Sequence, residues 1–119
     1  MKKLLAILLL GLASTAHAEV NLIGYLHYKT LSQNTTEKKL FDAYMEGVTE
    51  SLMMANVINN IKDQQQIFCL PPDLPFGPQS LENVIDGTLK VFPEAKEERK
   101  DQSIVIIAIR SLEYMYPCK

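Results

Sequence analysis

The sequence predicts a small all-α domain, a bundle of about four helices with one disulfide. Three observations support this fold class. Apolar residues recur every three or four positions in several segments, which is typical of helices that bury one face. A proline-rich stretch at residues 70–78 separates these segments. The chain also holds two cysteines, Cys69 and Cys118, and both lie in the part that we expect to be exported.

Residues 1–18 have the organisation of a secretory signal peptide. Lys2 and Lys3 form the charged start, residues 4–12 form the apolar run, and cleavage is expected after Ala18. An uncleaved membrane anchor is the alternative, but the apolar run is shorter than the roughly 20 residues that span a bilayer. We therefore expect an exported mature domain that begins at Glu19.

Residues 19–119 fit one domain, since a chain of roughly 100 residues can bury a single core. Removal of Lys2 and Lys3 leaves 10 basic residues against 14 acidic ones, a net charge of −4. This balance argues against nucleic acid and against an anionic membrane surface as partners, and it mildly favours a basic partner.

The first predicted helix covers Asn21 to Leu31, with Leu22, Leu26 and Thr30 on one face. Tyr25 and Tyr28 leave a strand possible in this segment, because aromatic residues are common in strands.

The longest predicted helix runs from Thr36 to about Ile61. Thr36 is the expected N-cap, with Glu37 in the first turn, where a negative charge favours the helix dipole. Gly47 interrupts the pattern, either because another helix approaches it closely or because the helix tolerates it. The apolar positions expected to face inward are Leu40, Phe41, Tyr44, Met45, Val48, Leu52, Ala55 and Ile58.

The polar residues 59–66 should end this helix in a turn, and the prolines that follow exclude both helix and central strand. A further helix is predicted from Gln79 to Phe92, with Ser80 as a possible cap and Pro93 just beyond its end. Its expected buried face consists of Leu81, Val84, Ile85, Leu89 and Phe92. Residues 94–101 carry mixed charges and are expected to be a solvated loop or a first turn.

The last predicted helix runs from about Glu98 to Met115, and Pro117 stops it before Cys118. Its weak point is residues 104–107, where four β-branched side chains in a row would favour a strand. A strand there would need a partner, and no other segment of residues 19–119 reads as a good strand, so we predict a helix. Its inward residues should be Ile104, Ile107, Ile109, Leu112 and Met115.

The two cysteines favour a disulfide between Cys69 and Cys118, because an even number of cysteines in an exported chain is usually paired. In the chain-entropy model, closing a loop of about 50 residues contributes on the order of 4 kcal/mol. The bond would tie the C-terminus to the middle of the fold.

Two chemical alternatives involve the same cysteines. Cys69 could be a nucleophile with His27 as its base, which would leave Cys118 free, since His27 is the one histidine after the signal. Cys69, Cys118, His27 and a carboxylate could instead bind zinc, but the sequence has no closely spaced ligand pair. We expect no catalytic residues, no metal and no cofactor. The adjacent carboxylates Glu97 and Glu98 read as a solvated face.

Several short motifs, taken in order, resemble the Rap/Tai family of type VI secretion immunity proteins. The resemblance covers nearly all of the chain from Leu22 to Cys118. Its motifs are Tyr44-Met45-Glu46-Gly47-Val48, Phe68-Cys69-Leu70-Pro71, Gln79-Ser80-Leu81 with Val84-Ile85, the segment from Leu89 to Pro93, and Tyr116-Pro117-Cys118.

This resemblance implies a small periplasmic helical protein, often a homodimer, that protects its bacterium from a type VI secretion effector. In the best understood members of the family the effector is a peptidoglycan amidase delivered by sibling cells, and the immunity protein binds it and occludes its active-site cleft. The chain would then be an inhibitor and not an enzyme. The alternative is a periplasmic helical interaction or assembly protein of the same fold with another partner.

The chain departs from the family pattern because it has no cysteine before Cys69, whereas family members commonly carry a further cysteine pair in that part. The other pair is intact, which supports pairing of Cys69 with Cys118. The first helix would then be held by hydrophobic contacts alone.

The proline-rich loop is the predicted partner-binding segment. Prolines restrict the loop before binding, which lowers the entropic cost of association. Phe76 could insert into a partner as an apolar anchor, or it could fold back onto the core of its own chain. The candidate partner-binding residues are Asp73, Leu74, Phe76, Glu82 and Asp86, with the carboxylates meeting basic groups of the partner.

Overall fold

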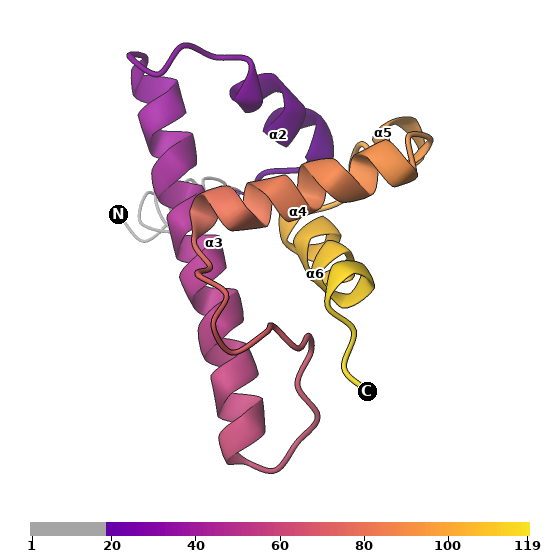
Figure 1. Ribbon diagram of the computed structural model, residues 1–119. Helices are drawn as coiled ribbons and strands as arrows, with labels where there is room; N and C mark the ends of the chain where they lie inside the picture. The colour runs from indigo at the N-terminus through magenta and orange to yellow at the C-terminus, as the bar shows by residue number, and fades with distance from the viewer. Residues whose placement is uncertain (1–18) are drawn as a thin grey trace, which may run out of the picture.

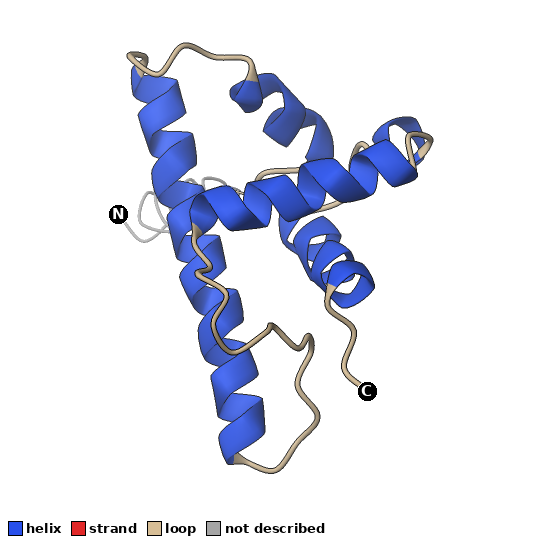
Figure 2. Ribbon diagram, viewed as in Figure 1, coloured by secondary structure: helices blue, strands red, loops and turns tan. Residues whose placement is uncertain are grey.

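The computed structural model describes residues 19–119, and the predicted signal peptide lies outside this range. Within it the chain is helical and has no strand (Figure 2), which confirms the predicted all-α class. The helices are α2 (Leu22–Lys29), α3 (Thr36–Ile61), α4 (Pro78–Val91), α5 (Ala95–Glu98) and α6 (Ile104–Met115).

The long helix α3 forms one side of the molecule, and α4 begins beside it and runs away from it across the molecule (Figure 1). α6 packs against α4 over the most extensive helix contact in the fold, and α2 packs against both α3 and α6. The segment between α3 and α4 leaves the far end of α3 and returns along it (Figure 1). Both the return segment and the C-terminus therefore lie below α4 in this view.

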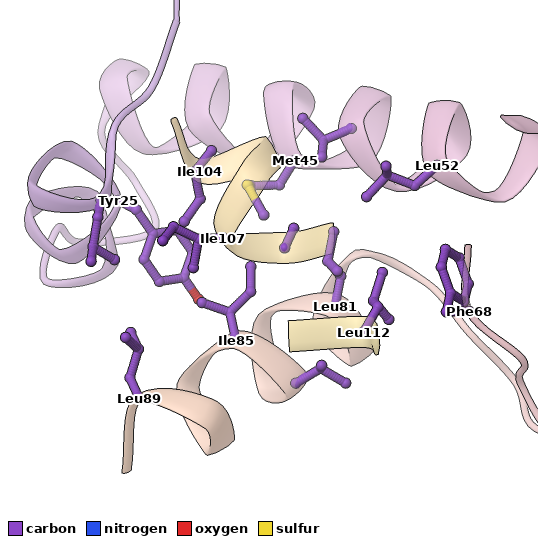
Figure 3. Close-up of a cluster of buried hydrophobic side chains, with 14 of the residues drawn as sticks. Tyr25, Met45, Leu52, Phe68, Leu81, Ile85, Leu89, Ile104, Ile107 and Leu112 are labelled. Atoms are coloured by element: carbon purple, nitrogen blue, oxygen red, sulfur yellow. The ribbon is translucent and has the colours of Figure 1, made fainter. Parts of the chain in front are cut away.

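The core lies where α2, α3, α4 and α6 meet (Figure 3). Tyr25, Met45, Ile85 and Ile104, one from each of these helices, are almost completely buried. Phe68 lies at one end of the cluster beside Leu52 of α3, although it belongs to the segment between α3 and α4 (Figure 3). One buried cluster therefore joins four helices and one irregular segment.

Two local predictions about α3 need correction. Thr35, and not Thr36, is the N-cap, and its Oγ1 accepts a hydrogen bond from the Lys38 N–H at 3.2 Å. A Cβ added at Gly47 would meet nothing within 4 Å among residues 19–119. Of the two explanations for Gly47, the close approach of another helix is therefore wrong among residues 19–119, which leaves simple tolerance of the glycine.

The predicted inward residues of α3 divide between two faces. Phe41, Met45 and Leu52 are buried as predicted. Leu40 and Ile58 are 67% and 42% exposed, so the prediction is wrong for these two residues. The core occupies one side of α3, and Leu40 and Ile58 lie on another.

Helix α4 begins at Pro78, and its N-cap is Gly77. Ser80, the predicted cap, lies at the third position of the helix, where its Oγ accepts a hydrogen bond from the Gly77 N–H at 3.2 Å. Proline suits the first helical position because its missing N–H would have no partner there. Four of the five predicted inward residues are buried, but Phe92 is 40% exposed just beyond the end of α4.

The run of β-branched residues at 104–107 is helical, as predicted, but α6 begins at Ile104 and not near Glu98. Ser103 is its N-cap and accepts a hydrogen bond from the Val105 N–H. Residues 95–98 form the separate short helix α5. Met115, predicted to face inward, is exposed at the C-terminal end of α6.

Hydrogen bonds between backbones join the start of α2 to the start of α6. The Leu22 N–H donates to the Gln102 carbonyl at 2.9 Å, and the Ile104 N–H donates to the Val20 carbonyl at 2.8 Å. The first N–H groups of a helix have no partner inside it. Residues 100–103 supply such partners for α2, which explains why they are not the first turn of α6.

A polar network also holds α2 against α4. The Tyr25 hydroxyl donates to Asp86 Oδ1 at 2.8 Å. Lys29 Nζ lies 3.2 Å from Glu82 Oε1 and 3.0 Å from Asp86 Oδ2. The expectation that hydrophobic contacts alone hold the first helix is therefore wrong.

The network shifts the pKa values of two groups. Burial, followed by the hydrogen bond to Asp86, raises the pKa of Tyr25 well above its ordinary value of 10.0. Burial lowers the pKa of Lys29, but the hydrogen bond to Asp86 and the charges of Glu82 and Asp86 outweigh it, so this pKa lies above its ordinary value of 10.5. The folded chain therefore keeps two protons that the unfolded chain releases more easily.

We predict that stability falls at alkaline pH. Because folding raises both pKa values, the contributions of Tyr25 and Lys29 are complete below about pH 10 and are lost as the pH rises further. Urea unfolding from pH 7 to pH 11 should show this loss of stability, and the loss should be smaller in Tyr25→Phe.

Tyr114→Phe, which changes an exposed tyrosine, is the control and should lose as much stability as the wild type over the same pH range. Equal alkaline losses in the wild type and in Tyr25→Phe would contradict the role of Tyr25.

Candidate partner-binding loop

Residues 70–77, which we call the proline loop, form the second half of the segment between α3 and α4. The first half begins where α3 ends. There Asp63 has a φ of 53°, in the left-handed region that stops many helices. The chain then turns back toward the core (Figure 1). Two attachments fix its course before the proline loop begins.

The first attachment is the buried side chain of Asn56 on α3. Its Nδ2 donates to the Phe68 carbonyl at 2.8 Å, and its Oδ1 accepts from the Ile67 N–H at 2.8 Å and from the Phe68 N–H at 3.3 Å. These backbone groups lie outside any helix and need partners when buried. Asn56 supplies them, and Phe68 can therefore enter the core.

The second attachment is the disulfide between Cys69 and Cys118, whose Cα atoms are 5.0 Å apart. The predicted pairing is confirmed. The Cys69 N–H also donates to the Tyr116 carbonyl at 2.9 Å, so the C-terminal segment is held by both covalent and hydrogen bonds. Because the bond uses both cysteines of the sequence, neither the Cys69–His27 pair nor the zinc site is compatible with it. His27 is exposed on α2.

Asp73 and Leu74 lie exposed at the tip of the proline loop. A turn shapes this tip, because the Leu74 N–H donates to the Pro71 carbonyl at 3.1 Å. Phe76 is half-buried and packs against the core cluster. Of the two interpretations of Phe76, the structure favours the one in which it folds back onto its own chain.

A shallow hollow lies beside the proline loop, between it and the facing sides of α4 and α6. Leu74 and Phe76 line one wall, Asn83 of α4 lines another, and Met115 with Tyr116 closes the end. Leu74 and Met115 both expose apolar surface at its rim. This hollow can receive an apolar side chain from a partner, and the exposed Asp73, which precedes Leu74 in the chain, can meet a cation.

Glu82 and Asp86, the other predicted binding residues, lie apart from this hollow. Both are paired with Lys29, and Glu82 is only 7% exposed. A partner's cation would have to displace Lys29 from a nearly buried carboxylate. The candidate surface therefore reduces to Asp73 and Leu74 with the neighbouring hollow.

Sequence reasoning missed Asn56, which positions the loop. The sequence did indicate that Asn56 is buried, because this residue follows Met45, Thr49 and Leu52 at helical spacing on the buried side of α3. A polar residue on such a face must find buried hydrogen-bond partners. The identity of those partners in the following segment is set by the fold and not by local pattern.

Among residues 19–119, no helix is long and apolar enough to cross a membrane, and no three potential metal ligands of the His, Cys, Asp or Glu type lie together. No protein-family model, curated protein or solved structure matches the chain. The candidate surface therefore rests on the geometry of this chain.

We predict that Asn56→Ala lowers the free energy of unfolding by about 2–3 kcal/mol, because it leaves buried backbone groups of Ile67 and Phe68 without partners. Urea denaturation measures this loss. Asn60→Ala is a matched control, since Asn60 is an exposed asparagine one turn further along α3, and it should change stability little. Equal effects of the two substitutions would show that the bonds of Asn56 do not fix the loop.

Proposed function

We propose that this protein is a periplasmic immunity protein that binds a secreted toxin and blocks its active-site cleft. The toxin that fits best is a peptidoglycan amidase delivered by a type VI secretion system. One observation carries this proposal: Asp73 and Leu74 stand exposed on a loop that is fixed at its base by Asn56 and the disulfide. The ordered motifs that resemble the Rap/Tai family supply the toxin class.

The proline loop is suited to enter a cleft because its shape is largely set before binding. The disulfide restrains its start, the packing of Phe76 restrains its end, and the turn at Asp73 and Leu74 is closed by its own hydrogen bond. A preorganised loop loses little conformational entropy on association. The net charge of −4 after loss of the signal favours approach to a basic rim around such a cleft.

The proposal predicts a secreted peptidoglycan amidase or another secreted toxin encoded beside the gene for this chain, and it is tested with the product of that neighbouring gene. The two purified proteins should form a stable complex by titration calorimetry, and the complex should no longer cleave peptidoglycan. If the chain neither binds nor inhibits the neighbouring enzyme, immunity by this pair is wrong. Recovery of a different periplasmic partner would instead favour an interaction or assembly protein.

We predict that Asp73→Lys and Leu74→Asp each weaken toxin binding at least about tenfold, which corresponds to about 1.4 kcal/mol. Both residues are exposed, so the melting temperature should stay nearly unchanged. Asp101→Lys makes the same charge change at another exposed site and should leave the affinity unaltered. Unchanged affinity in both loop variants would place the toxin on another surface.

A further inference from the structure

A pocket with a volume of about 290 Å³ lies where the end of α4, the short helix α5 and α6 meet. Figure 1 shows α5 at the end of α4 that points away from α3. No residue lines both this pocket and the hollow beside the proline loop, and none of the predicted binding residues lines the pocket. We call it the α5 pocket, and it is separate from the candidate partner-binding surface.

The inner surface of the α5 pocket is largely apolar. Leu89 of α4 and Ile107 of α6 line it, and both are buried. Phe92 and Tyr114 also line it but are 40% and 51% exposed, and their rings pack edge to face with centroids 5.2 Å apart. Ligand pockets are typically lined by apolar and aromatic side chains with a few polar groups among them. This surface favours an apolar group of a ligand.

Ser111 of α6 places a polar group among these apolar side chains. It lines the pocket and is only 1% exposed. The hydroxyls of Thr49 and Thr88 bond to carbonyls one turn back in their helices, but the Ser111 hydroxyl makes no hydrogen bond within residues 19–119. Every side-chain nitrogen or oxygen that is closed off from solvent in this range has a partner. The Ser111 hydroxyl therefore reaches the open space of the pocket, where it can bond to a ligand.

The pocket is also bordered by four exposed charged side chains of both signs, Glu94, Glu98, Arg99 and Arg110. None of the ion pairs found among residues 19–119 includes any of these four residues. The Arg99 guanidinium makes one long hydrogen bond, to Gln102 Oε1 at 3.4 Å. Positive and negative groups therefore surround one pocket without pairing with each other, and both remain free to bind charged groups of a ligand.

We propose that the α5 pocket binds an α-amino acid with an apolar side chain. The apolar side chain of the ligand packs against Leu89, Phe92 and Ile107. The ligand's carboxylate accepts hydrogen bonds from Arg110, since arginine can bind a carboxylate through two parallel N–H groups. The Ser111 hydroxyl donates to the same carboxylate. The ligand's ammonium group binds a carboxylate of Glu94 or Glu98 at the pocket's border.

The mixed charges favour this ligand over simpler ones. A plain carboxylic acid would bring its negative charge close to Glu94 and Glu98, and a plain amine would bring its positive charge close to the two arginines. An amino acid carries both charges next to each other. The pocket is small, since ligand pockets usually measure roughly 300–1,000 Å³, so a single amino acid fits better than a longer peptide.

Amino-acid binding at the α5 pocket does not depend on the function proposed above. No residue of the proline loop lines the pocket. Binding of an amino acid and inhibition of a toxin can therefore be measured separately in the same variants.

The test uses the mature chain labelled with nitrogen-15 and follows its amide NMR signals during titration with L-leucine. The titration extends to about 10 mM, which nearly saturates a site with a dissociation constant of about 1 mM. The signals of Ser111 and Tyr114 should shift. Three analogues should each bind at least about tenfold more weakly, because each lacks one group that the pocket contacts. These are 4-methylpentanoate without the ammonium group, leucinamide without the carboxylate, and glycine without the apolar side chain.

Two variants test the residues assigned to the carboxylate. Arg110→Gln and Ser111→Ala should each weaken L-leucine binding at least about tenfold, because each removes a hydrogen bond to a charged group. Arg110 is exposed and Ser111→Ala adds no volume, so both variants should fold normally. Lys90→Gln is the control, since Lys90 is an exposed cation near the end of α4 that does not line the pocket, and this variant should bind L-leucine like the wild type.

The absence of any shift at Ser111 and Tyr114 with L-leucine would overturn the proposal. Equally tight binding of 4-methylpentanoate or leucinamide would overturn it too, since the pocket would then not recognise both charges. Unchanged affinity in both Arg110→Gln and Ser111→Ala would place the ligand elsewhere on the chain. If L-leucine does not bind and Phe92→Ala instead abolishes toxin inhibition, the pocket belongs to the toxin interface and the proposal is wrong.

Discussion

The bond between Cys69 and Cys118 joins two parts of the chain that lie outside the helices. One is the long segment between α3 and α4, and the other is the C-terminal end after α6. Long irregular segments need specific attachments to keep one conformation. The disulfide supplies one attachment, and Asn56 supplies the other at the neighbouring residues Ile67 and Phe68. The position of the proline loop relative to α4 and α6 follows from both.

The opposite end of the fold is held by noncovalent means. The N-terminus of α2 shares backbone hydrogen bonds with the segment before α6, and Lys29 pairs with two carboxylates of α4. The Tyr25 ring lies in the core while its hydroxyl reaches Asp86. These contacts connect α2 to the segment before α6, to α4 and to the core. The molecule therefore has one covalently fixed end, which carries the candidate binding loop, and one end fixed by a polar network over the core.

The sequence predicts the helices well where one face is buried, as in α4, since periodicity alone reports such a face. The sequence predicts helix boundaries less well where a long-range contact determines them. The start of α6 shifts because Gln102 pairs with Leu22, and that pairing leaves no periodic signal. In α3 both faces are apolar, so the pattern could not show that Leu40 faces outward. The disulfide was predictable from two cysteines, whereas the pairing of Glu82 with Lys29 was not.

The double variant Cys69→Ser with Cys118→Ser tests most directly whether the disulfide fixes the end of the fold that carries the candidate binding loop. Its free energy of unfolding should fall by about 4 kcal/mol for a closed loop of about 50 residues. The amide exchange rates of residue 69 and of Leu74 should rise before those of α4, because in the wild type these two N–H groups donate to the carbonyls of Tyr116 and Pro71. Unchanged stability with unchanged exchange in the loop, or two alkylatable thiols in the native protein, would contradict this account.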